Sequence, residues 1–130
     1  MDKSNLNISN IENYLFTLFD NKVSNNTYIG TLPDTINDTW QDMVLIDFGT
    51  QINDFDAMGR CVVHIFLYAK PLSNGSKNVK VLADLEDRFN EVMENQHSKE
   101  YQLNHAYDDS DYDKDRKWHF NIKALNLMIF

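Results

Sequence analysis

The sequence is poor in the residue types that usually mark covalent staples or catalytic loops. Its 130 residues include one cysteine, Cys61, two prolines and four glycines. A lone cysteine excludes an internal disulfide and a cysteine-based zinc cluster. The four glycines lie far apart in the chain and form neither a phosphate-binding loop nor a dinucleotide-binding motif. We also find no G-x-S-x-G or H-E-x-x-H motif.

Basic residues are scarce as well, with 12 Lys and Arg against 20 Asp and Glu, a formal net charge of −8. Neutralising phosphates needs clustered Lys and Arg, so this balance argues against a general nucleic-acid binder and against docking on anionic lipid. The first residues are polar, without the apolar core of a signal peptide, and no run approaches the ~20 apolar residues of a membrane span. We therefore expect an intracellular, soluble protein, with residues 1–130 forming one domain.

Two segments have the apolar spacing of amphipathic helices. The first follows Ser9-x-x-Glu12, the pattern of a capping box, and runs from about Asn10 to Asp20. The second runs from about Ser76 to Asn95 and pairs a continuous apolar stripe with a charged face. Residues 21–42 between the first helix and the next element read as an irregular connection, in which Thr27-Tyr28-Ile29 could form a short edge strand.

The remaining segments alternate as strands do. Met43 to Phe48 predicts one strand, and Arg60 to Ala69 predicts a central strand because both of its faces are apolar. Tyr101 to Tyr107 and Trp118 to Phe130 predict a second hairpin, joined by an acidic turn from Asp108 to Lys117. The order is α-β-β-α-β-β, which predicts an α+β fold with a mainly antiparallel four- or five-stranded sheet packed against two helices.

The acidic turn raises the question of a calcium site. Asp109, Asp111 and Asp113 have the spacing of the first three ligands of an EF-hand loop, but Lys114 replaces the required glycine and Phe120 the required glutamate. We interpret this run as a solvated turn. His105 and His119 lie in strands that should pair, yet two imidazoles alone make a poor zinc site.

No residue stands out as a nucleophile. Cys61 begins a predicted central strand with no basic partner beside it, which is typical of a buried structural thiol. The sequence thus predicts a protein that is not an enzyme, with no catalytic residue, metal or cofactor.

Two loops carry candidate subunit or partner contacts. The predicted loop between Gly49 and Gly59 presents apolar side chains that either fold back over the sheet or form an interface. The acidic turn is the other protrusion. The candidate contact residues are Ile52, Asp54, Phe55, Asp56 and Met58 in the first loop, and Asp109, Asp111, Tyr112 and Asp113 in the second.

The order of these elements resembles a known group, the tail terminator, tail completion and neck (head–tail connector) ring proteins of tailed bacteriophages. Those proteins are small and share an N-terminal helix, a proline-containing loop before a strand, a long hairpin, a central helix and a closing antiparallel hairpin. The corresponding segments here are Ile11–Phe19, Leu32-Pro33 leading to Met43–Phe48, Arg60–Tyr68, Val79–Met93 and Trp118–Met128.

The resemblance implies a non-enzymatic virion protein that forms a hexameric or dodecameric ring at the neck or the head-proximal end of the tail. Such a ring would be assembled in the host bacterial cytoplasm and would contact portal, connector or tail-tube proteins. It would let DNA pass without specific binding, with the sheet lining or flanking the channel. Acidic walls suit this task, because a basic passage would hold the duplex.

Two other classes stay open at this stage. A small bacterial interaction or immunity-type protein is acidic when it covers a basic partner, and the charge balance fits that equally well. An enzyme that uses the acidic turn and a divalent metal ion is the third class, and it predicts stabilisation by calcium or magnesium.

Overall fold

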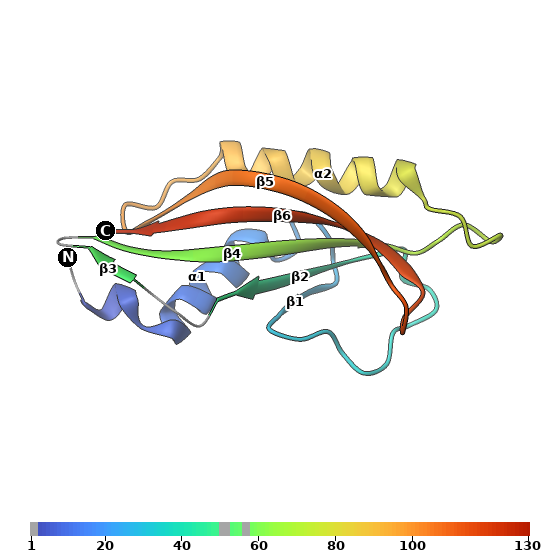
Figure 1. The fold of residues 1–130 in the computed structure, drawn as a ribbon, viewed down its shortest axis with the longest axis horizontal. Coiled ribbons are helices and arrows are strands. Elements are labelled where there is room, and N and C mark those ends of the chain that lie inside the picture. The colour runs from blue at the N-terminus through green and yellow to red at the C-terminus, as the bar shows by residue number, and fades with distance from the viewer. Residues whose placement is uncertain (1–2, 50–52, 56–57) are drawn as a thin grey trace.

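The computed structural model describes residues 3–49, 53–55 and 58–130 (Figure 1). A short 3-10 segment, Lys3–Leu6, leads into the first helix. In chain order the elements are then α1 (Ile8–Phe19), β1 (Thr27–Ile29), β2 (Asp42–Phe48), β3 (Asn53–Phe55), β4 (Met58–Ala69), α2 (Val79–Glu94), β5 (Tyr101–Asp113) and β6 (Trp118–Ile129).

The predicted α+β class is confirmed, but the sheet is mixed and the element order differs from the predicted one. Over the described residues the strand order is β1-β2-β4-β6-β5, and β3 pairs with the first residues of β4. β1 runs parallel to β2, while the other pairs are antiparallel. The predicted order omitted β1 and β3, because three-residue strands are too short to show a period of two.

Both helices pack on one face of the sheet and close a single core. Ile11, Leu15 and Phe19 of α1 meet Leu85 and Phe89 of α2 over the odd-numbered residues of β4. The rings of Phe19 and Phe89 stack with centroids 5.9 Å apart, which joins the two helices directly. In Figure 1, α1 lies behind the strands and α2 runs along β5. No helix in the described part of the chain is long and apolar enough to cross a membrane.

Several predicted boundaries differ from the structure. The prediction of a capping box at Ser9 is wrong. The helix α1 begins earlier, at Ile8, and Asn7 is its N-cap residue, without a capping hydrogen bond from its side chain. The acidic turn is wrong too. β5 continues through Asp113, so the acidic residues from Asp108 to Asp113 lie in a strand, and the turn is the shorter segment 114–117, which contains Asp115. Asp is depleted in strands, which is why composition favoured a turn there.

The segment between β1 and β2 covers part of the other sheet face. Leu32 is buried against Met43, Tyr68 and Trp118, and the partly buried Ile36 and Trp40 pack on the same cluster. Trp40 and Tyr28 face each other with ring centroids 6.1 Å apart. This connection therefore acts as a packed cover over one end of the second face, and within residues 3–49, 53–55 and 58–130 no other layer lies on the remainder of that face.

Cys61 is 2% exposed, and burial raises the pKa of its thiol to about 11. At pH 8 only about one such thiol in a thousand is ionised, and the thiolate is the reactive species. We expect a thiol reagent such as Ellman's reagent to label Cys61 only after denaturant is added. Labelling of the folded protein at the rate of a free thiol would contradict the structural role.

Tyr14 offers a test of the helix packing. Its ring stacks on Tyr101 at 4.6 Å, and its hydroxyl is buried without a hydrogen-bond partner among the described residues. Burial, and then the neighbouring Tyr101, raises the pKa of Tyr14. We expect Tyr14→Phe to leave stability unchanged or to raise it by up to about 1 kcal/mol in urea unfolding. Tyr101→Phe is the matched control, because Tyr101 donates to the Asn5 carbonyl at 3.0 Å and its loss should cost about 1 kcal/mol.

Candidate functional site

The second sheet face is unusual because β6 turns its apolar side chains toward it. Antiparallel pairing with β4 places Phe120 and Ile122 beside Tyr68 and Phe66, on the face that has no helix. The polar residues of the same stretch, Asn121 and Lys123, point toward α2 instead. An ordinary amphipathic strand has the opposite orientation, with its apolar side facing the covering layer. The first half of β6 therefore builds an apolar surface where no helix covers it.

The strand register arranges this surface in cross-strand rows. One row runs from Leu45 through Phe66 and Ile122 to Asp109. The neighbouring row has Asp47, His64, Ala124 and Tyr107 in the same strand order. We call the uncovered part of the second face the open face, defined by Leu45, Asp47, Val62, His64, Phe66, Tyr107, Asp109, Asp111, Phe120 and Ile122.

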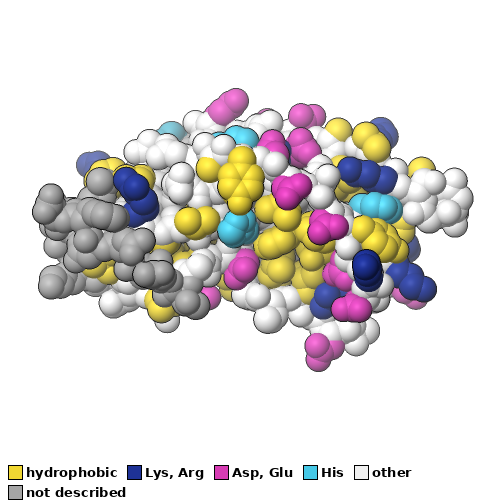
Figure 2. Space-filling model, viewed as in Figure 1, with side chains coloured by type: hydrophobic (Ala, Val, Ile, Leu, Met, Phe, Trp, Pro, Cys, Tyr) yellow, Lys and Arg dark blue, Asp and Glu magenta, His cyan; other side chains and the backbone are white. Residues whose placement is uncertain are grey.

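Much of the open face is accessible to solvent. Tyr107 is 58% exposed and Val62 is 45% exposed, while Phe66, Phe120 and Ile122 are half-buried. Phe66 and Phe120 lie in contact, with centroids 5.6 Å apart. Figure 2 shows apolar side chains gathered in the middle of this view of the molecule, with acidic side chains around them. Contiguous apolar surface with a polar rim is typical of an interaction site.

Carboxylates border the apolar centre on two sides. Asp47 is exposed on β2, and Asp109 and Asp111 are exposed on β5. The last two also accept hydrogen bonds from the backbone amides that follow them, Ser110 at 2.8 Å and Tyr112 at 2.7 Å. Near the start of β5, the Gln96 side chain accepts from the Leu103 amide at 2.8 Å and donates to the Leu103 carbonyl at 3.0 Å. Because the backbone groups of Leu103, Ser110 and Tyr112 already have partners, β5 is a poor template for an added strand at these positions, and the candidate interaction surface is the face of the sheet.

The structure separates the predicted contact residues of the acidic segment. Asp109 and Asp111 lie on the open face. Tyr112 lies in register with His119 on the helix side, where the two rings are 4.7 Å apart. Asp113 stabilises the turn at residues 114–117. Its carboxylate accepts hydrogen bonds from the amides of Asp115 and Arg116, each at 3.0 Å, and pairs with the Arg116 guanidinium at 3.2 Å.

The predicted contacts of the other loop are only partly described. Ile52 and Asp56 lie outside the described residues. Asp54 and Phe55 form part of β3 and Met58 begins β4, and their backbones pair in the hairpin register Asp54↔Gly59 and Phe55↔Met58. The segment predicted as an irregular loop thus contains strand pairing. The role of these five residues in contacts stays a prediction.

The calcium-like spacing does not gather ligands in one place. Asp109, Asp111 and Asp113 are spread along an extended strand, and Asp113 is engaged by the turn. Among the described residues no group of three or more His, Cys, Asp or Glu side chains is placed to hold a metal ion. The two histidines are apart as well, because His105 lies opposite Leu125 and His119 lies opposite Tyr112.

Under α2, Lys123 forms a buried ionic cluster that sequence reasoning missed. Its side chain is 5% exposed, and its Nζ lies 3.1 Å from Asp108 and 3.4 Å from Glu86. The ammonium also lies 5.7 Å from the centroid of the Phe89 ring. Burial acts to raise the pKa of Asp108, but hydrogen bonds and charge from His105 and Lys123 outweigh it and hold this pKa below its usual value. The cluster connects α2 to β5 and β6, so its role is structural.

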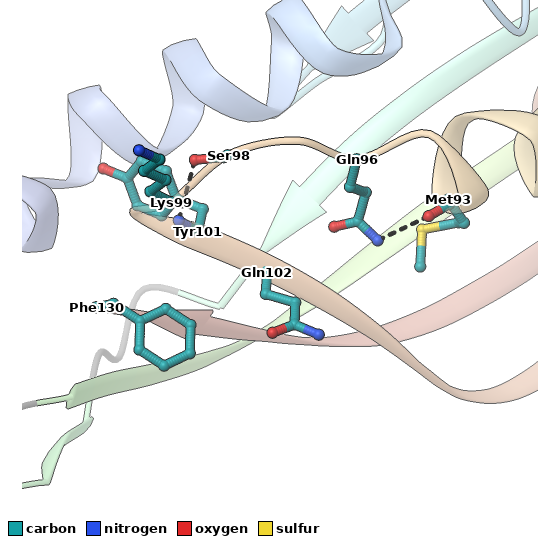
Figure 3. Close-up of a pocket in the computed structure, with 7 residues that line it drawn as sticks. All are labelled: Met93, Gln96, Ser98, Lys99, Tyr101, Gln102 and Phe130. Atoms are coloured by element: carbon teal, nitrogen blue, oxygen red, sulfur yellow. Dashed lines mark hydrogen bonds between the residues drawn. The ribbon is translucent and has the colours of Figure 1, made fainter.

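A hollow of about 510 Å³ lies near the last residues of the chain, between the end of α2 and the start of β5 (Figure 3). Several of its polar groups are already used by the fold. Gln96 donates to the carbonyls of Met93 and Leu103, each at 3.0 Å, and the Tyr101 amide donates to Ser98 Oγ at 3.2 Å. The Ser98 hydroxyl also donates to the Glu100 carboxylate and accepts from the Glu100 amide, each at 3.2 Å, so it is occupied by the local turn and we assign the hollow no chemistry.

Comparison with known proteins adds no identity to this geometry. No described protein family matches the sequence. No curated protein is similar enough to count as a relative. The open face and its charges are therefore the features of this molecule that bear on its function.

The open face was only partly predictable. The sequence indicated that both faces of the 60–69 strand are apolar, which is the signal for Phe66 and Val62. It gave no sign that Phe120 and Ile122 would point away from the helices, because that depends on the register between β4 and β6.

Proposed function

We propose that this protein is a non-enzymatic structural subunit of a phage virion, which forms a ring at the neck or the head-proximal end of the tail. The ring joins or terminates the tail and lets DNA pass. The observation that carries this proposal is the open face, an exposed apolar surface on the central strands with carboxylates at its border. A surface of that kind needs a protein cover, and a ring supplies one from its own copies.

The charge supports the same proposal. The chain has a net charge of −8, and the exposed side of α2 adds the carboxylates of Asp87, Glu91 and Glu94 to those of the open face. A ring built from such subunits repels phosphate, so a DNA duplex passes without being held. The partners beyond the ring itself are the neighbouring portal or connector proteins, or the tail tube.

Two residues that could support chemistry, His105 and Cys61, have structural roles in this fold, which favours a structural protein. His105 pairs with Asp108 at 2.6 Å within the Lys123 cluster. Cys61 is buried in the core. The proposal therefore assigns no catalytic residue and no cofactor to the chain.

Electron microscopy of the purified protein tests the proposal. We expect closed rings with a central opening, and the same ring in particles that contain the protein. Portal, capsid or tail-tube genes beside its gene would add support. Particles that contain the protein without any ring density assignable to it would contradict the proposal.

A second function is favoured by one feature of the same surface. Asp47, Asp109 and Asp111 around an apolar centre also suit a small acidic interaction or immunity-type protein that covers a basic partner. That function predicts a monomer at every concentration and a one-to-one complex with the partner. The assembly state of the purified protein separates the two functions.

A further inference from the structure

One end of the molecule has a projecting loop that is basic, whereas the border of the open face is acidic. The loop between β4 and α2 projects beyond the ends of both elements (Figure 1). Together with the first turn of α2 it exposes two apolar side chains, Leu72 at 48% and Val79 at 65%. Lys77 and Lys80 are exposed beside them, and residues 70–80 contain no Asp or Glu, although Lys80 pairs with Asp84 on the next turn of α2 at 3.5 Å. We call residues 71–80 the knob.

Local hydrogen bonds fix the shape of the knob. The Gly75 amide donates to the Leu72 carbonyl at 2.8 Å, and the Leu72 amide donates to the Ser76 carbonyl at 2.9 Å. The Asn74 side chain accepts from the Ser76 amide at 3.0 Å. Gly75 has a φ of +85°, a conformation that glycine adopts without strain. Because this turn is already ordered, little conformational entropy is lost when it binds.

The knob and the open face are complementary in charge and in apolar content. The knob presents exposed lysines with a leucine and a valine, while the open face presents Asp109 and Asp111 beside aromatic and aliphatic side chains. Two open faces could not meet each other equally well, because their carboxylates would be brought together. Contact between two different surfaces of identical chains is heterologous, and it produces a ring when the rotation between copies closes.

We propose that the knob of one copy docks on the open face of the next copy, and that this contact closes the ring. The inference rests on the proposed function, since it names the contact between neighbouring subunits. It assigns Leu72 and Val79 to the apolar centre of the neighbour's open face and Lys77 to the carboxylates of Asp109 and Asp111.

Cross-linking tests the direction of the contact. A variant with both Leu72→Cys and Tyr107→Cys, treated with a short bismaleimide, should give a ladder of dimers, trimers and larger species. An equal mixture of the two single variants should stop at dimers, because each copy then has one reactive site. The native Cys61 is buried and should not react. Leu72→Cys mixed with Asn90→Cys, on the exposed side of α2, is the matched control and should give no product.

Charge exchange tests the chemistry of the contact. Lys77→Glu alone and Asp111→Lys alone should each weaken association by about tenfold. The variant that carries both changes should recover most of the lost association, because opposite charges face each other again. Both changes are on exposed side chains, so circular dichroism should show a folded protein for all three variants.

The outcomes separate the inference from the proposed function. If light scattering shows an oligomer and the double-cysteine variant gives no species beyond a dimer, the knob contact is wrong and the ring proposal stands. If the purified protein is a monomer at every concentration and gives no ladder of cross-linked species, both the knob contact and the proposal that the purified protein forms a ring are wrong. A ladder of cross-linked species, together with recovery of association in the variant that carries both charge changes, supports the knob contact and the ring proposal.

Discussion

Replacing Phe89 with alanine is expected to lower the free energy of unfolding by about 3–5 kcal/mol, the usual cost of removing a large aromatic side chain from a core. Phe89 is 1% exposed, stacks on Phe19 of α1 and lies beneath the ammonium of Lys123. Phe89 therefore connects α2, in which it lies, with α1 and with the ionic cluster. Domains of this size have total stabilities of about 5–15 kcal/mol, so the loss should be visible as a large drop in the urea midpoint.

The matched control is Asn90→Ala, next to Phe89 on the exposed side of α2 and outside the knob. Surface changes of this kind usually shift stability by no more than about 0.5 kcal/mol. A Phe89→Ala variant that unfolds at the same urea concentration as the Asn90→Ala variant would show that α1 and α2 do not share the core described above.

Removing both carboxylates next to Lys123 is expected to cost about 2–4 kcal/mol. The variant Glu86→Gln/Asp108→Asn leaves a buried ammonium beside neutral amides, and an unpaired buried charge is strongly destabilising. The two carboxylates are partly exposed, with 36% and 52% of their side chains accessible, so the cost should be lower than for a fully buried pair. Urea unfolding at neutral pH measures it.

The control for this variant removes the charge itself. Adding Lys123→Met to Glu86→Gln/Asp108→Asn should recover most of the lost stability, because an apolar side chain of similar length then fills the site. Equal stability of the double variant and the unmodified protein would mean that Lys123 is not held by these carboxylates.

The same cluster gives a pH dependence. The pKa of Asp108 is lower in the folded chain than its usual value, so the pairing stabilises the folded state above the unfolded pKa and is lost as pH falls through the folded pKa. The stability difference between the unmodified protein and Asp108→Asn should therefore be largest at neutral pH and shrink below about pH 4. A difference that grows toward acid pH would contradict the pairing.

The long periodic elements could be predicted from the sequence, and the reasons are physical. α2 and β4 carry apolar residues at the helical and strand periods over many residues, so burial alone fixes their type. β1 and β3 have three residues each, too few for a period, and β1 pairs with a strand that follows a long connection. The packing of that connection around Leu32 and Trp40 holds β1 beside β2, together with hydrogen bonds from the Ser24 and Asn26 side chains to Asp42.

The site was harder to predict because it depends on the register between strands. Alternation in β6 shows that Ile122 and Lys123 point to opposite faces, but it cannot show which of these faces the helices cover. Pairing of Ile65 with Lys123 puts the lysine under α2 and leaves Ile122 on the open face. A buried lysine is paired with acidic partners, and its two carboxylates come from α2 and β5, which are distant in the sequence.

The most direct test of the central claim, that the open face is an interface between copies of this chain, is the molar mass in solution by light scattering across a dilution series. The unmodified chain should give a closed oligomer, a hexamer or dodecamer of the 15.3 kDa subunit, and Asp109→Lys/Asp111→Lys should shift it toward the monomer. A 15.3 kDa monomer for the unmodified protein at every concentration would contradict the claim, and so would an oligomer that the double lysine variant leaves unchanged.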